Sequence, residues 1–113
     1  MFTQPALSEV VEGMKVYDRD SNEIGTVDTF RVGEGTIKAA ETDIVTIVET
    51  ISDALGGHKD LPTVLYARFY DKGFVRVKRG LFRSDLLIIP DQINDINEIS
   101  IHLNVDEREL IKI

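Results

Sequence analysis

The fold is decided by residues 13–28, which read GMKVYDRDSNEIGTVD. Residues 14–17 alternate apolar and polar side chains, which is typical of a strand with one buried face. Turn-forming residues follow at 18–22, and residues 23–32 give a second strand. The stretch therefore predicts an antiparallel hairpin, in which Gly25 marks a bulge or a close approach of two backbones.

Apolar residues at helical spacing follow between residues 36 and 56. They recur every three or four positions, which places them on one stripe of an amphipathic helix: Ile37, Ala40, Ile44, Ile47, Val48, Ile51 and Leu55. Thr36 is the expected N-cap, and Gly56 is the expected left-handed residue after the helix. Many residues here are β-branched, which opposes a helix, but the periodicity favours one.

The second half of the chain predicts four more strands. Residues 64–70 and 74–79 flank the turn 71–73 and read as a hairpin. Residues 85–89 form a buried run that ends at Pro90, where a helical turn begins. Residues 98–103 give a last strand, with inward side chains at Ile99, Ile101 and Leu103, and a short helix is expected over 105–110.

These elements predict a mainly β fold, a small closed or nearly closed six-stranded barrel with one inserted amphipathic helix and short terminal helical turns. Residues 1–12 read as a lead-in, and residues 13–113 as the barrel domain with its helical insertion at about 36–56.

Two stretches resemble the PRC-barrel family. Residues 13–18 with 24–28 are similar to its opening hairpin, and residues 85–90 with 99–103 are similar to its closing half. The resemblance implies a small barrel that serves as a docking and assembly module and has no shared catalytic residues. The insertion around residues 33–60 departs from the family pattern.

Composition excludes several classes of protein. The chain has 113 residues and no cysteine, so disulfides and thiolate chemistry are absent. Its longest apolar run, residues 86–89, is too short to cross a bilayer. The first residues have neither a basic segment nor an apolar core typical of a secretory signal. We therefore expect a cytoplasmic protein that is not inserted in a membrane.

No motif predicts catalysis, a cofactor or a metal site. Asp18, Asp20 and Asn22 imitate the start of a calcium loop, but the later ligands are missing, and a polar hairpin turn is the favoured interpretation. Gly33-x-Gly35 lacks the third glycine of a dinucleotide-binding turn. Residues Ser84, Asp85 and His102 make a triad on paper only, without a nucleophile elbow, and His58 has no paired partner.

Charge is unevenly distributed. Residues 68–83 carry a net +5, which leaves −12 for the rest of a chain whose total is −7. The expected hairpin places basic and aromatic side chains on one outer face, next to further arginines, and this set is the candidate partner-binding surface: Tyr66, Arg68, Tyr70, Arg76, Lys78, Arg79 and Arg83. Such a face can bind RNA, or its arginines can pair with acids of the same chain or of a second subunit.

Three functions remain open. The first is a non-catalytic docking module, active in stress or assembly processes, that forms a homodimer and binds a protein partner; its candidate self-association residues are Ile37, Ile44, Ile47, Val48, Ile51 and Leu55. The second is an RNA- or ribosome-associated factor that uses residues 66–83. The third is a small-ligand binder or enzyme with a pocket between helix and barrel.

Overall fold

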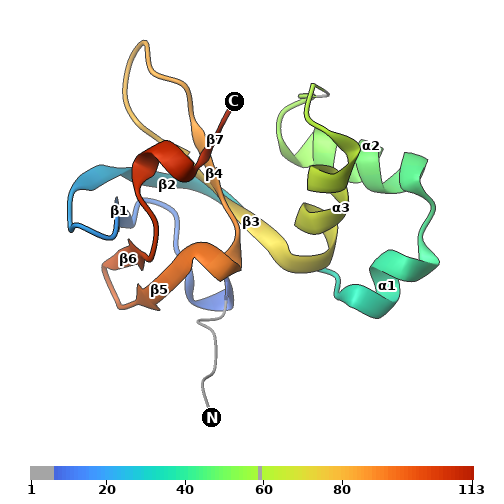
Figure 1. The fold of residues 1–113 in the computed structure, drawn as a ribbon, viewed down its shortest axis with the longest axis horizontal. Helices are drawn as coiled ribbons and strands as arrows, with labels where there is room; N and C mark the ends of the chain where they lie inside the picture. Colours follow the sequence, from blue (N-terminus) through green and yellow to red (C-terminus); the bar gives the residue numbers. More distant parts are fainter. Residues whose placement is uncertain (1–6, 59) are drawn as a thin grey trace.

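The computed structural model describes residues 7–58 and 60–113 (Figure 1). Its seven strands are β1 (Lys15–Tyr17), β2 (Glu23–Val32), β3 (Gly73–Lys78), β4 (Leu86–Ile88), β5 (Ile93–Ile96), β6 (Ser100–Leu103) and β7 (Ile111–Lys112). Its helices are α1 (Thr36–Glu41), α2 (Ile44–Ala54) and α3 (Thr63–Lys72), with 3-10 turns η1 (Leu7–Glu9), η2 (Pro90–Gln92) and η3 (Glu107–Glu109). Residues 1–6 of the expected lead-in lie outside the described residues, and its described part contains η1.

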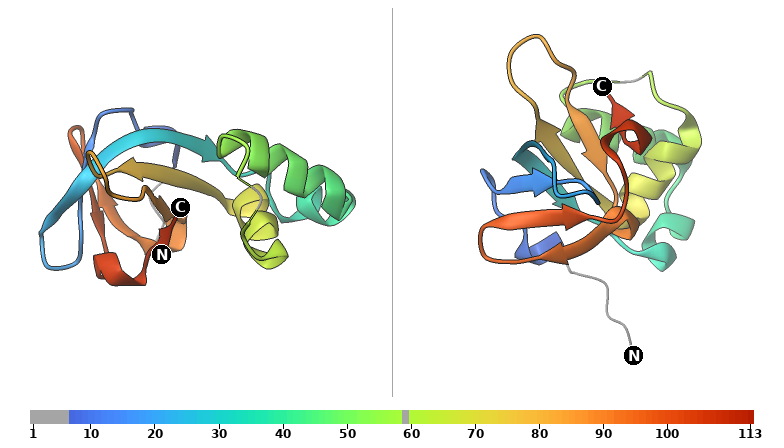
Figure 2. Two further views of the ribbon diagram at one scale, coloured as in Figure 1. Left: turned by 90° about the horizontal axis from the view of Figure 1, so that it is seen from above. Right: turned by 60° about the vertical axis from the view of Figure 1, so that its left-hand side comes forward.

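All seven strands belong to one sheet in the order β5-β6-β1-β2-β3-β4-β7. The sheet curls into a half-barrel, with the helices grouped at one end (Figure 2). A barrel-like, β-rich fold is therefore confirmed. The six strands and the closed barrel are wrong: β5 and β7 are edge strands and do not pair with each other.

The predicted opening hairpin is confirmed. β1 pairs antiparallel with β2, with a register shift between Val16 and Tyr17. Gly25 permits a close approach, because a Cβ atom here would overlap the Lys78 carbonyl of the neighbouring strand β3. β1 also pairs in parallel with β6, which brings the two ends of the barrel domain together.

The helices are inserted between two neighbouring strands. β2 pairs antiparallel with β3 up to the pair Val32 and Gly73, and the chain between them forms α1, α2 and α3. Gly73 ends α3 with a positive φ of 88°, which favours glycine. The chain therefore leaves the sheet after Val32 and returns to it at Gly73, the residue that pairs with Val32.

Each face of β3 and β4 contributes to a separate hydrophobic core. Val75 and Val77 point into the half-barrel, as expected, and pack there with residues of the other strands. Phe74 and Leu87 point the opposite way and pack against α2 and α3. Alternation along strands buried on both sides thus joins the helices to the sheet.

The prediction of a single helix over residues 36–56 is wrong, because this segment forms two helices, α1 and α2. Thr42 is extended, with ψ of 137°, and Asp43 caps α2 by accepting a hydrogen bond from the Thr46 N–H at 2.9 Å. The N-cap of α1 is Gly35 and not Thr36. Gly56 has a φ of 79°, so the expected left-handed residue after the helix is confirmed.

The predicted strand over residues 64–70 is wrong, because this segment is the helix α3. Tyr66, Phe69 and Tyr70 recur at helical spacing and are all buried. Alternation of apolar residues fits the same short window, and here the helical period prevails. The final strand also needs a correction, since Ile99 precedes β6 and is 77% exposed, while Ile101 and Leu103 are buried as expected.

The cap of α2 makes stability depend on pH. Asp43 accepts hydrogen bonds from the N–H and the hydroxyl of Thr46. These bonds, the backbone one most strongly, hold the pKa of this carboxyl below its ordinary value. Because the folded pKa is depressed, the stabilisation is present at neutral pH and is lost as pH falls through the folded value. We expect Asp43→Ala to unfold at a lower temperature than the wild type at pH 7, with a difference that shrinks below about pH 4. Asp43→Asn is the control, since asparagine caps equally well without titrating. An unfolding temperature of Asp43→Asn as low as that of Asp43→Ala at pH 7 would contradict the capping role of Asp43.

Candidate docking surface

The helical layer leaves apolar side chains exposed on its outer side. Ile44 and Val45 begin α2 and are 46% and 63% exposed, and Val64 at the start of α3 is 64% exposed. A hollow of about 370 Å³ lies here, which we call the helical groove; it is lined by Ile44, Val45, Val48, Glu49 and Thr63. A second hollow, of about 400 Å³ and partly lined by Val64, extends the surface between α1 and α3.

The amphipathic pattern of α2 explains why this surface is apolar. Ile47, Ile51 and Leu55 are at most 4% exposed and pack against α3 and the sheet. Ile44 and Val45 are exposed, and Val48 packs against that core only in part, so burial on one side does not use the whole stripe. Contiguous exposed apolar side chains beside a hollow are typical of an interaction surface.

The candidate self-association residues are therefore divided between two roles. Ile47, Ile51 and Leu55 are inside the helical core and cannot contact a partner. Ile44 and Val48 line the helical groove, and Ile37 of α1 is 78% exposed. The residues of the predicted stripe therefore lie partly in the helical core and partly on the exposed surface.

Sequence reasoning missed Val45 and Val64. Val45 lies one position off the helical stripe, and Val64 was placed in a strand. Recognising α3 as a helix would have placed Val64 in its first turn, next to Thr63, which lines the groove.

The structure does not gather the basic and aromatic residues on one face. Tyr66 and Tyr70 are 1% and 5% exposed inside the helical core, and Arg68 lies on the exposed side of α3. Only Arg76 and Lys78 are on β3. The predicted aromatic sheet face is wrong, because it depends on residues 64–70 being a strand, and the RNA alternative loses the surface on which it was based.

Two of the arginines instead hold the loop between β3 and β4. Arg79 and Arg83 both donate to one carboxylate oxygen of Glu107, at 2.8 and 3.2 Å. The tip of this loop exposes an apolar pair, Leu81 at 85% and Phe82 at 104%. The sequence shows this pair between arginines but carries no signal for its exposure.

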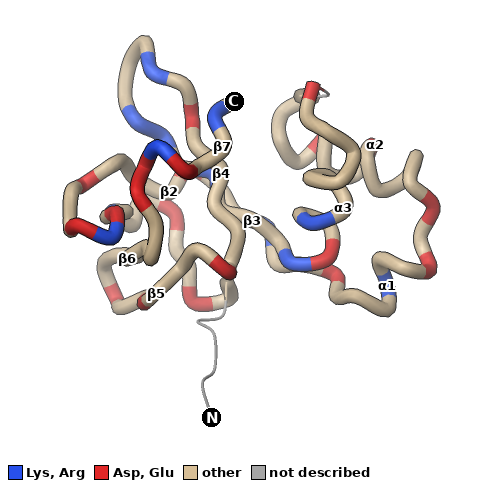
Figure 3. Tube along the Cα trace, viewed as in Figure 1, with Lys and Arg blue, Asp and Glu red and all other residues tan. Residues whose placement is uncertain are grey.

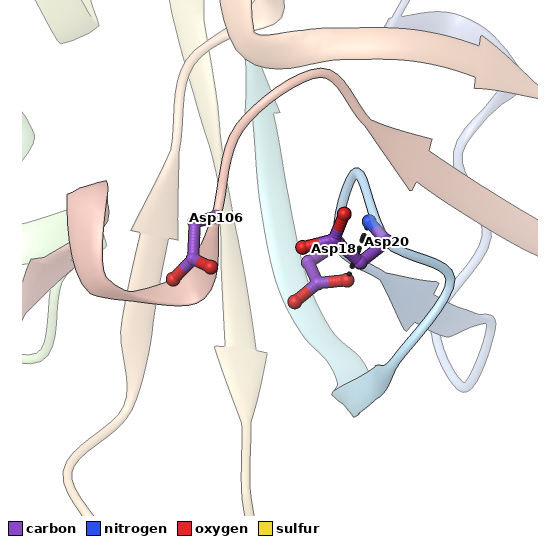
Figure 4. A group of neighbouring side chains, drawn as sticks. All are labelled: Asp18, Asp20 and Asp106. Carbon is purple, nitrogen blue, oxygen red and sulfur yellow. Dashed lines mark hydrogen bonds between the residues drawn. The ribbon is translucent and has the colours of Figure 1, made fainter.

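A cluster of carboxylates lies at the β1–β2 turn (Figure 4). Asp18, Asp20 and Asp106 each offer an oxygen within 4.8 Å of the others. Asp18 is 5% exposed, and its Oδ1 accepts hydrogen bonds from the N–H groups of Asp20 and Asn22. These bonds confirm the predicted polar hairpin turn.

The third member of the cluster is also used locally. Asp106 caps η3 by accepting from the Arg108 N–H at 2.9 Å. The hydrogen bond from the Arg108 side chain and that backbone bond lower the pKa of Asp106. The cluster is thus explained by a turn and a cap, and we do not assign it to a metal ion.

Ser84, Asp85 and His102 do not form a catalytic triad, since Asp85 and His102 have other partners. Asp85 accepts from Arg76 Nε at 2.8 Å. His102 stacks on Tyr17 with ring centroids 5.0 Å apart, and its Nε2 lies 3.1 Å from Ser100 Oγ. His58 lies in the α2–α3 connection, where its carbonyl accepts from the Tyr66 hydroxyl.

Comparisons with protein families, with curated proteins and with solved structures gave no match. Within residues 7–58 and 60–113, no helix combines the length and the apolar character that a membrane span requires.

Proposed function

We propose that this protein is a non-catalytic docking module that self-associates through the helical groove. The observation that carries the proposal is the exposure of Ile44 and Val45 at the helical groove and of Val64 at the neighbouring hollow, on a helical layer whose inner side is already packed. Covering such side chains removes apolar surface from water, which drives association.

Two further points support a docking role. The first is the resemblance of the opening hairpin and closing half to the PRC-barrel family, whose members serve as assembly modules. The second is that the candidate catalytic groups Asp85 and His102 are occupied by structural partners. A protein partner in place of a second copy would use the same surface.

Self-association should depend on Val45. We expect the wild-type chain to form oligomers whose population rises with concentration in sedimentation velocity experiments. Val45→Lys should raise the dissociation constant about tenfold or more, since burial of one valine is worth about 1.5 kcal/mol. Circular dichroism and thermal unfolding of the variant should show that it still folds.

Val11→Lys is the matched control. Val11 is 59% exposed, close to the value for Val45, and also lines a hollow, but that hollow lies beside β1 and not on the helical layer. This variant should associate as the wild type does. A wild-type chain that stays monomeric at high concentration would refute self-association, and equal association of Val45→Lys and the wild type would remove the groove from it.

A further inference from the structure

The β3–β4 loop is built to present an apolar tip. Its residues Leu81 and Phe82 are 85% and 104% exposed. Phe82 also has a φ of +68°, in the left-handed region that bulky side chains rarely adopt. The loop extends beyond the sheet, away from the helices (Figures 1 and 2).

The base of the loop is fixed by side-chain hydrogen bonds. Arg79 donates from Nε to the Ser84 carbonyl at 2.7 Å and from Nη1 to Glu107 at 2.8 Å, and its side chain is only 7% exposed. Arg83 reaches the same carboxylate from the other side of the loop. A loop fixed in this way loses little conformational entropy when its tip is buried by a partner.

The loop and the helical groove have opposite charges. Lys78 is exposed, and Arg83 is 55% exposed although it pairs with Glu107, so basic groups flank the apolar tip. The groove is lined by Glu49, and the only other charged residue of α2 is the exposed Asp53. Figure 3 shows basic residues along the loop, with one acidic segment where it returns to β4, and acidic residues on the connection between α1 and α2.

The tip does not reach the groove of its own chain. Phe82 and Val45 both remain exposed, so neither covers the other. A second copy, however, offers an apolar hollow with an acidic border to an apolar tip with basic flanks. Apolar character and sign of charge are thus complementary between two different surfaces of the same chain.

We propose that Leu81 and Phe82 of one copy insert into the helical groove of a second copy. The proposal rests on the function proposed above and specifies its partner: the tip of one copy contacts the groove of another, so the contact joins two different surfaces of the chain. Two copies can exchange tips reciprocally, or copies can add in a row.

Complementation between two variants tests this contact. The tip variant is Leu81→Ser with Phe82→Asn, where asparagine suits the positive φ and should preserve the fold. The groove variant is Val45→Lys. Each alone should raise the dissociation constant about tenfold or more in sedimentation equilibrium, and an equimolar mixture should form heterodimers, because one intact tip then meets one intact groove.

The control is Ile99→Asn. Ile99 is an apolar residue just before β6, is 77% exposed and lies outside both the tip and the groove, so its substitution should leave association unchanged. If the groove variant dissociates and the tip variant does not, the copies pair groove to groove; this inference is then overturned while the proposed function stands. Failure of the mixture to form heterodimers also overturns it. A monomeric wild type overturns both proposals.

Vesicles provide a second arm of the test. We expect no cosedimentation of the wild type with vesicles of phosphatidylcholine and phosphatidylserine beyond that of the tip variant. Vesicle binding that requires the tip, together with self-association that does not, would assign the loop to a membrane surface and overturn the proposal.

Discussion

Gly73→Ala is expected to lower the free energy of unfolding by more than about 3 kcal/mol, or to prevent folding altogether. A Cβ atom at this position would overlap the Arg31 carbonyl oxygen and lie 2.7 Å from both Gly33 N and Leu7 Cδ1. The φ of +88° adds a conformational cost for any residue with a side chain. Urea denaturation followed by circular dichroism measures the loss.

Gly80→Ala is the matched control for this prediction. Gly80 also has a positive φ, of 102°, but an added Cβ would have nothing within 4 Å. Its substitution should cost about 1 kcal/mol from backbone conformation alone. Equal losses for the two variants would show that the contact between strands β2 and β3 at Gly73 is not tight.

Arg76→Ala should be the next most destabilising change, at about 2–4 kcal/mol. The Arg76 side chain is 24% exposed and connects the sheet with the end of α2. Its Nε donates to Asp85 at 2.8 Å, and its Nη1 donates to the Leu55 carbonyl at 2.9 Å. Removing it leaves a partly buried carboxylate and a carbonyl at the helix end with one partner fewer.

Lys78→Ala provides the comparison for Arg76, because Lys78 is exposed on the same strand. Its effect should stay within about 0.5 kcal/mol. Arg76→Lys should recover only part of the loss, since an ammonium group cannot reproduce two divergent guanidinium hydrogen bonds. Full stability of Arg76→Ala in thermal and urea unfolding would contradict a structural role for this residue.

The sheet was largely predictable because its strands carry local signals. Strict alternation indicated β1, and the run that ends at Pro90 indicated β4 and the turn after it. β7 has two residues, too few for any periodicity. Closure was inferred from six short strands with glycine bends and hairpin connections, and no such local pattern shows whether the two edges of a sheet meet.

The candidate surface was predictable only in part. The helical stripe identified Ile44 and Val48, but it could not say which of its members face a core, because that depends on where α3 packs. Residues 64–70 fitted both a strand and a helix, so the aromatic pair Tyr66 and Tyr70 was placed outside although both are buried. Exposure of Phe82 follows from the loop's hydrogen bonds, which join residues distant in sequence.

The insertion of the helical layer between β2 and β3 also affects how the chain folds. Val32 and Gly73 pair across the sheet although about forty residues separate them, and closing a loop of that length in an unstructured chain has an entropic cost. Early compaction of α2 against α3 shortens the distance that this pairing has to bridge. The rate of folding should therefore follow the stability of the helices, although they contribute nothing to the sheet's own hydrogen bonds.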